Sequence, residues 1–303
     1  MEVGSLIAII AGILAYFGLG VVLRVTGLLK SEDAQPLNTV LMYVALPALI
    51  FVTVQKSTLQ PSLIGVVALA WVIALVGMAL AWGLTRLLKL EGPTAGAFIL
   101  LAVFGNTGYI GYPVASAILG DPGLARAIFY DVFGNTMAVI TIGTFVVSRY
   151  GHHNVKVNPL REIVTFPPFI ALAAALALHS VSIPLVVTDW LAALGKLVVP
   201  VVMISVGLTL KPRAIRTQLG KSLAAASLKL VVLPLIAFGI GLVLFADDVS
   251  LRIGVLQAGV PSMMLTMIMG MRFKLDVDFI ASTILLTMIG GVITIPVWQL
   301  LIG

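Results

Sequence analysis

The sequence predicts an all-α polytopic membrane protein with ten transmembrane helices, arranged as two five-helix repeats of inverted topology. The first supporting observation is composition. Of 303 residues, 60% are hydrophobic and only 10% are charged, whereas about 25% are charged in ordinary soluble domains. With a mean hydropathy of +1.17, so many apolar residues cannot all be hidden in one core of this size, and most must face lipid. A soluble enzyme and a separate soluble domain are therefore excluded.

The second observation is a series of apolar runs, each bounded by charges or by Pro/Gly clusters. A membrane helix needs about 20 apolar residues, and these runs satisfy that length. In the first half the expected spans are residues 4–23, 37–55, 62–88, 93–118 and 124–149. In the second half they are residues 163–180, 190–210, 221–245, 250–271 and 278–302. The first run lacks the basic segment of a signal peptide, so we expect it to be retained as a span.

The loop cations give these spans an orientation. One side collects Arg24, Lys30, Arg86, Lys89, Arg149, Lys156, Arg161, Lys211, Arg213, Arg216, Lys221, Arg272 and Lys274. The other side holds only Lys56, Arg126 and Arg252. Because Lys and Arg concentrate in cytoplasmic loops, we expect a protein of the cytoplasmic membrane with both termini on the extracytoplasmic side.

The third observation is an internal parallel between the two halves. A polar linker, residues 150–162, separates a first repeat, 1–149, from a second repeat, 163–303. Pro47 and Pro200 lie at matching depths of the second and seventh spans, 153 residues apart. The same shift carries the segment 105–113 onto the segment 257–263, to within a few residues. Because five is an odd number of crossings, the second repeat must have inverted topology, as in many secondary transporters.

The fourth span contains a break. Gly105, Gly108, Gly111 and Pro113 interrupt it, and Gly or Pro inside a helix weakens the turn and frees backbone groups. Non-helical backbone is tolerated at membrane depth only where protein or a water-filled cavity covers it. We therefore expect Asn106, Thr107 and Tyr109 to line such a cavity.

The ninth span repeats this break with Gly259, Pro261 and Ser262. Two helices broken near the midplane from opposite sides present half-helix N-termini, whose free N–H groups suit an anion. A carboxylate is the natural ligand of such a site. The alternative is a pair of simple kinks, since Gly and Pro are common in membrane helices.

Few ionisable residues lie inside the spans, and each is costly there. Asp131 and Lys196 are both expected in the outer third, where they either pair or leave Lys196 to attract an anion or to snorkel toward the headgroups. Lys229, near the inner end of the eighth span, is expected to snorkel. Asn135, one helical turn beyond Asp131, extends a polar stripe toward the midplane.

The sequence offers no catalytic, metal or cofactor motif. It contains no cysteine, and its three histidines have no zinc-site spacing. No basic patch interleaved with aromatic residues indicates nucleic-acid binding. An intramembrane hydrolase would need a nucleophile and a base at one depth, and no Ser/His or paired-Asp arrangement supplies them.

Four motifs resemble the auxin efflux carrier family, which includes plant PIN-type carriers and bacterial malate or malonate permeases. They are GNTGYIGYP (105–113), LGKLVVPVVMISVGLTL (194–210), GVPSMM (259–264) and LLTMIGGVITIPVW (285–298). The resemblance covers essentially the whole chain. It implies a fold related to bile acid and sodium/proton transporters, in which the fourth and ninth spans cross as broken helices. It also implies a scaffold of spans one, two, six and seven, a mobile unit of spans three to five and eight to ten, and elevator-like transport.

The resemblance assigns the family's crossover asparagine to Asn106, with Asn135 as a further carry-over. The predicted substrate site comprises Asn106, Thr107, Gly108, Tyr109, Pro113, Asn135, Gln257, Gly259, Pro261, Ser262, Tyr43 and Lys196, with Asp131 as the coupling candidate. The chain lacks the long central loop of the plant carriers. It also lacks a cluster of intramembrane acids, so sodium or proton coupling is not indicated.

The leading hypothesis is a carrier of a small organic anion in the lipid bilayer, with no cofactor. The alternative is a receptor or regulatory protein that keeps the transporter architecture without translocation. A homodimer is compatible with either, because the scaffolds of elevator transporters commonly associate.

Overall fold

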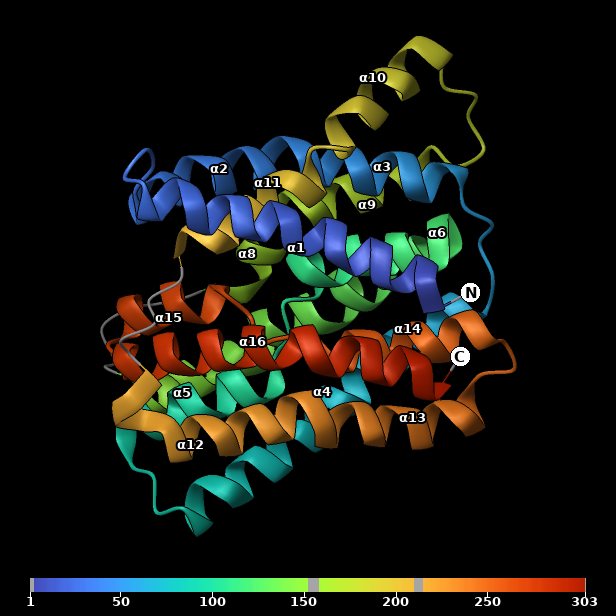
Figure 1. Cartoon of the computed structure of the whole chain (residues 1–303). Helices are drawn as coiled ribbons and strands as arrows, with labels where there is room; N and C mark the ends of the chain where they lie inside the picture. The colour runs from blue at the N-terminus through green and yellow to red at the C-terminus, as the bar shows by residue number, and fades with distance from the viewer. Residues whose placement is uncertain (1–2, 152–157, 210–214, 303) are drawn as a thin grey trace.

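The computed structural model describes residues 3–151, 158–209 and 215–302, and within these ranges every regular element is helical (Figure 1). The predicted helical class is therefore confirmed. Part of the predicted linker, residues 152–157, lies outside the described residues, as do the loop cations Lys156, Lys211 and Arg213 and the side chain of Arg216.

The first half of the chain forms a series of α-helices, with one short 3-10 segment (η1) and four π-helical segments (η2 to η5) between them. They are α1 (Val3–Val25), η1 (Ser31–Asp33), α2 (Ala34–Val40), η2 (Leu41–Ala45), α3 (Leu46–Lys56), α4 (Ser62–Leu87), α5 (Gly92–Val103), η3 (Thr107–Gly111), α6 (Tyr112–Phe129), η4 (Tyr130–Thr136), η5 (Val139–Gly143) and α7 (Thr144–Tyr150). Within α6, Gly120 has a positive φ of 62°. This conformation costs glycine little, and it separates the ranges expected for the fourth and fifth spans.

The second half is also a series of α-helices with a short π-helical segment. Its helices are α8 (Pro159–Val164), α9 (Pro167–Ala177), α10 (Leu185–Gly195), α11 (Val198–Thr209), α12 (Ile215–Ser227), η7 (Leu228–Val232), α13 (Leu233–Leu244), α14 (Asp248–Gly259), α15 (Leu265–Phe273) and α16 (Val277–Ile302). Each predicted span in this half overlaps one helix or an interrupted pair of helices.

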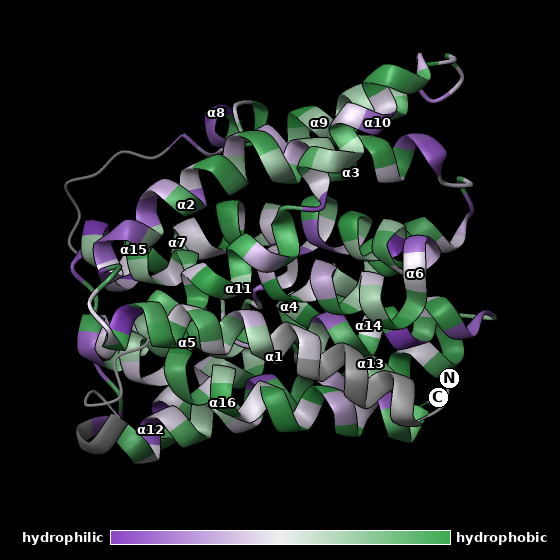
Figure 2. Ribbon diagram, turned by 45° about the horizontal axis from the view of Figure 1, so that its top comes forward, coloured by the Kyte–Doolittle hydropathy of each residue, from purple (hydrophilic) through white to green (hydrophobic). Residues whose placement is uncertain are grey.

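Six helical segments of the described residues are long and apolar enough to cross a membrane. They are Ser31–Lys56, Ser62–Leu87, Thr107–Tyr150, Leu185–Thr209, Gln218–Leu244 and Val277–Ile302. Figure 2 shows apolar residues along the lengths of the helices and hydrophilic residues mainly near helix ends. Large apolar side chains lie on the outside, including Val243 at 90% exposure. The molecule is therefore a multi-pass membrane protein, while the count of ten spans stays a prediction.

The helices pack in two groups. In one group α1 packs along α11, and α3 packs on α9 and α10. The α1–α11 contact brings the two backbones together, because a Cβ on Gly207 would lie 2.9 Å from the Cα of Gly20. In the other group α4 packs on α5, α13 and α14, and α12 packs on α16. In both views α1 begins and α16 ends at the same end of the bundle (Figures 1 and 2).

Candidate functional site

Two interrupted helices meet inside the protein. Helix α5 ends at Val103 and η3 begins at Thr107, while α14 ends at Gly259 and α15 begins at Leu265. The two interruptions pair with each other in antiparallel fashion at Gly105 and Ser262. The N–H of Asn106 donates to the carbonyl of Pro261 at 2.8 Å, and the N–H of Met263 donates to the carbonyl of Phe104 at 3.0 Å. Each break therefore satisfies backbone groups of the other, as burial in a membrane protein requires.

Ser262 fixes this pairing on the second break. Its hydroxyl donates to the carbonyl of Leu101 at 2.7 Å, and its backbone N–H donates to the hydroxyl of Thr287 at 3.1 Å. Ser262 is fully buried, so its contacts are with the protein.

Asp131 is the buried carboxylate nearest to the first break. It lies in the π-helix η4, and three hydroxyls donate to it: Thr107 at 2.6 Å, Tyr112 at 2.7 Å and Thr136 at 3.0 Å. Asp131 and Thr107 were predicted site residues, and the structure brings them together. Tyr112 and Thr136 were missed, because their roles depend on which face of each helix meets the carboxylate.

Asn135 joins the same network from the same π-helix. Its Nδ2 donates to the carbonyl of Gly105 at 3.0 Å and to the hydroxyl of Thr107 at 2.9 Å. Gly108 lies close to the carboxylate, since an added Cβ would lie 3.0 Å from Asp131 Oδ2. The predicted polar stripe of Asp131 and Asn135 therefore faces the first break.

Two buried amide groups near the breaks retain polar atoms without a hydrogen-bond partner among the described residues. They are Asn106 Nδ2 and Gln257 Oε1. The other ends are held: Asn106 Oδ1 accepts the N–H of Tyr109 at 3.3 Å, and Gln257 Nε2 donates to the carbonyl of Ala127 at 3.2 Å. A buried polar atom left unpaired costs about 1–3 kcal/mol. One donor and one acceptor are thus available for a polar ligand.

Lys229 corrects one prediction from the sequence. It does not snorkel, because its side chain is only 1% exposed. Its Nζ instead donates to the carbonyl of Ala258, in the last turn of α14. Helix ends leave carbonyls without intrahelical partners and carry partial negative charge, which an ammonium group satisfies. Lys229 also lies against the first break, since a Cβ on Gly105 would be 3.0 Å from its Nζ.

A cavity of about 640 Å³ opens between α3, α6, α10 and the start of α11. We call it the basic cavity. Its lining residues are Leu49, Val52, Thr53, Lys56, Ser57, Thr58, Gln60, Leu63, Tyr112, Pro113, Ser116, Asp121, Pro122, Leu124, Ala125, Arg126, Ala192, Gly195, Lys196, Val198 and Val199. These residues include three cations and one carboxylate, so the cavity attracts anions.

The basic cavity contains two of the predicted site residues, Pro113 and Lys196, and it reaches the Asp131 network through Tyr112. The pairing of Lys196 with Asp131, one of the expected alternatives, is not among the ion pairs of the described residues. Tyr43 is 67% exposed on η2 and does not line the cavity.

Arg126 lines this cavity and was not among the residues predicted for the site. Its Nε donates to the hydroxyl of Ser250 at 2.7 Å, and its Nη2 donates to Gln60 Oε1 at 3.2 Å and lies 3.3 Å from Asp247. Arg126 therefore joins the starts of α4 and α14. These contacts could not be predicted, because the segment 121–126 has the pattern of an ordinary turn and helix start.

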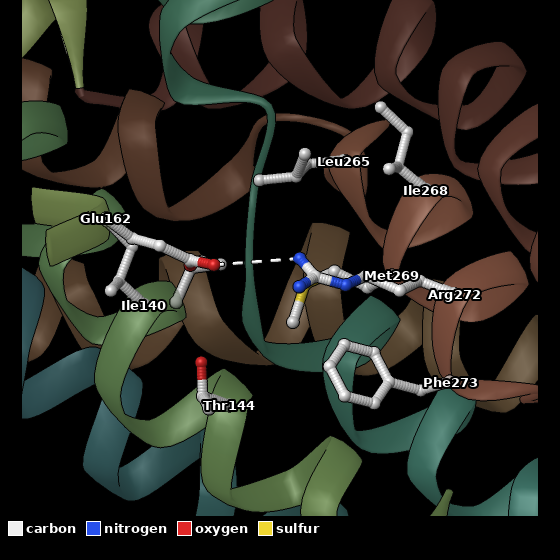
Figure 3. Close-up of a pocket in the computed structure, with 9 residues that line it drawn as sticks. Ile140, Thr144, Glu162, Leu265, Ile268, Met269, Arg272 and Phe273 are labelled. Atoms are coloured by element: carbon white, nitrogen blue, oxygen red, sulfur yellow. Dashed lines mark ion pairs between the residues drawn. The ribbon is translucent and has the colours of Figure 1, made fainter. Parts of the chain in front are cut away.

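A smaller pocket of about 230 Å³ lies between η5, α7, α8 and α15. Figure 3 shows Glu162 of α8 and Arg272 of α15 pointing toward one another across it. Their ion pair measures 3.6 Å. The rest of the lining is largely apolar, with Met269 and Phe273 beside the arginine.

The sequence is similar to a family of membrane transport proteins and to several named transporters. The sequence model of a family described as membrane transport protein matches residues 5–299. An uncharacterized transporter of Methanocaldococcus jannaschii is 32% identical, over 97% of this chain and 96% of its own length. An uncharacterized transporter of Methanothermobacter thermautotrophicus is 31% identical, over 94% of each chain. A putative malonate transporter of Rhizobium meliloti is 24% identical, over 93% of this chain and 92% of its own length.

Proposed function

Because the chain belongs to the membrane transport protein family, the auxin efflux carrier group that its motifs resemble, we propose that it is a secondary carrier of a small organic anion. The anion is a carboxylate, and it crosses the cytoplasmic membrane by alternating access. Family membership makes the chain a membrane transporter and not an enzyme. The name of the Rhizobium meliloti relative, a putative malonate transporter, favours a carboxylate.

The observation that carries the proposal is the basic cavity. Lys56, Arg126 and Lys196 line it against the single carboxylate of Asp121. It reaches Pro113, at the start of α6, which is separated from the first break by η3. The unpaired Asn106 Nδ2 near that break is a donor suited to a carboxylate oxygen. We infer that the anion enters through the basic cavity and binds at the paired breaks.

The packing of the helices supports an elevator mechanism. Helices α1, α2, α3, α9, α10 and α11 would form the scaffold, and α4 to α7 with α12 to α16 would form the mobile unit. The α1 and α11 backbones approach each other closely at Gly20 and Gly207, and both helices belong to the scaffold. The pairing of the two breaks lies within the mobile unit. Each unit is thus held together internally, which suits rigid-body movement.

The Glu162–Arg272 ion pair (Figure 3) would join the scaffold to the mobile unit, because α8 leads into α9 and α15 follows the second break. The positive-inside rule assigns Arg161 and Arg272 to the cytoplasmic side and Lys56 and Arg126 to the outer side. In this assignment the basic cavity opens outward, the ion pair closes the inner side, and both termini are extracytoplasmic.

Proteoliposome transport tests the proposed function. Malonate, malate, indole acetate and other carboxylates are applied to wild type, to Asn106→Ala and to Gln218→Ala, a control for loss of an amide side chain on α12. We expect saturable uptake by wild type and by the control, and loss of uptake in Asn106→Ala with an unchanged elution profile on size exclusion. Unchanged uptake kinetics in Asn106→Ala would remove this residue from the site. Binding without flux in wild type would favour the receptor alternative.

A further inference from the structure

Two lysines that line the basic cavity have no hydrogen-bond or ion-pair partner among the described residues. Lys56 is the last residue of α3, and Lys196 directly follows α10. No hydrogen bond or ion pair of either ammonium group is found among the described residues, and both side chains line the same cavity. Both would belong to the scaffold.

The third cation of the cavity differs from these lysines. The guanidinium of Arg126 is already bound to Ser250, to the carbonyl of Pro122, to Gln60 and to the carboxylate of Asp247. Its charge is therefore largely compensated by the protein. The two lysines carry positive charge that no described residue pairs with, and they are exposed, as is the carboxylate of Asp121.

Two like charges at the wall of a shared cavity repel each other, and an anion that approaches both relieves this repulsion. A ligand with one carboxylate can compensate only one ammonium group, whereas a ligand with two can compensate both. Apolar side chains, among them Leu49, Val52 and Val199, also line the cavity. Both ammonium groups are nevertheless exposed, so water screens part of the interaction and the expected effect is that of an exposed ion pair.

We propose that Lys56 and Lys196 are specificity-determining residues that select substrates with two carboxylates over substrates with one. This inference rests on the proposed function and deepens it. It assigns the choice of substrate charge to the basic cavity, through which the proposed function has the anion enter before one of its carboxylates binds at the paired breaks. Lys56 thereby becomes a substrate-binding residue that the motifs of the chain do not indicate.

The natural absence of cysteine allows a direct test on the full-length protein. The probes are malonate, a dianion at neutral pH, and its monomethyl ester, a monoanion of nearly the same shape. Binding is measured by calorimetry for wild type, Lys56→Cys, Lys196→Cys and the control Lys221→Cys, which lies on the exposed side of α12. Each introduced thiol is then converted with an aminoethyl thiosulfonate, which restores an ammonium group, or with a neutral methyl reagent.

We expect wild type and Lys221→Cys to prefer malonate over its ester. Lys56→Cys and Lys196→Cys should each lose up to about fivefold of that preference, the upper end of the range for a solvent-exposed ion pair. The aminoethyl reagent should restore the preference and the methyl reagent should not. Because both lysines are exposed, the variants should fold normally.

Three results would overturn the proposal: wild type binds neither probe, wild type binds both equally, or the preference survives in both variants. Parallel flux measurements in proteoliposomes separate this failure from failure of the proposed function. Lysine-dependent preference without flux supports the specificity pair and contradicts carrier activity. Flux with a preference that is independent of both lysines does the reverse.

Discussion

The N–H of Asn106 donates a hydrogen bond of 2.8 Å to the carbonyl of Pro261, 155 positions further along the chain. This bond joins the first break to the second. A proline at position 261 has no N–H of its own to satisfy, so its carbonyl is the group that must find a partner. The two breaks therefore depend on each other, and a substitution that disturbs the backbone at one break should also disturb the other.

Gly111 tests how tightly the breaks are packed. A Cβ at this position would overlap the side-chain amide of Gln257. We expect Gly111→Ala to destabilise the protein by about 1–3 kcal/mol, the usual cost of overpacking a buried site, and to reduce uptake. Gly83→Ala is the matched control, because an added Cβ there meets nothing within 4 Å. The measurement is thermal unfolding of both purified variants. Equal melting temperatures for Gly111→Ala and Gly83→Ala would contradict tight packing at Gly111.

Substitutions of Lys229 can separate the contribution of its buried ammonium group from the contribution of its aliphatic stem. Lys229→Met keeps the length and packing of the stem, whereas Lys229→Ala leaves a cavity that costs about 2–5 kcal/mol. We expect Met to retain most of the stability and Ala to lose it, and both to impair uptake, because the carbonyl of Ala258 loses its donor. Unfolding and uptake are measured on the same preparations. Full uptake by the Met variant would limit Lys229 to a packing role.

Asp131 is the candidate for a coupled proton. Three hydroxyls donate to its carboxylate, and Asp131→Asn would turn one accepting oxygen into a donor. If a proton travels on this carboxylate, uptake by wild type depends on external pH and uptake by Asp131→Asn does not. Uptake is measured across a pH series, with Asp121→Asn, in the basic cavity, as a second carboxylate variant. Identical pH profiles for wild type and Asp131→Asn would exclude Asp131 from coupling.

The Glu162–Arg272 ion pair should bias the position of the mobile unit. Both side chains are about half exposed, at 42% and 49%, so the pair contributes about 1 kcal/mol at most, or roughly a fivefold change in an equilibrium. We expect Glu162→Gln to raise labelling of a cysteine placed at Met269, in the pocket beneath the pair. The swapped variant Glu162→Arg with Arg272→Glu should restore the wild-type rate. Unchanged labelling in Glu162→Gln would show that the pair does not restrain the unit.

The sequence predicted the features that depend on local chemistry. Gly105 and Pro261 mark the positions where helices must stop, and the structure has both breaks. The helical spacing of Asp131 and Asn135 predicted one polar stripe, and the structure buries both side chains beside the first break. Burial of Lys229 could not be predicted, because it depends on which face of α13 and η7 meets the end of α14. The contacts of Arg126 could not be predicted either, because its partners Gln60 and Ser250 are distant from it in the sequence.

The π-helical turn Tyr130–Thr136 has a consequence for insertions and deletions. A π-turn bonds residue i to residue i+5 and therefore contains one residue more than an α-turn needs. Removing a single residue from this turn would leave an ordinary α-helix of nearly the same length and hydropathy. The flanking helices would keep their register, but the residues within the turn would be spaced differently, and the Asn135 amide would lose its position against Thr107. Such a shortened chain should still insert into the membrane while losing the polar network, so the length of this turn is constrained more strictly than its composition.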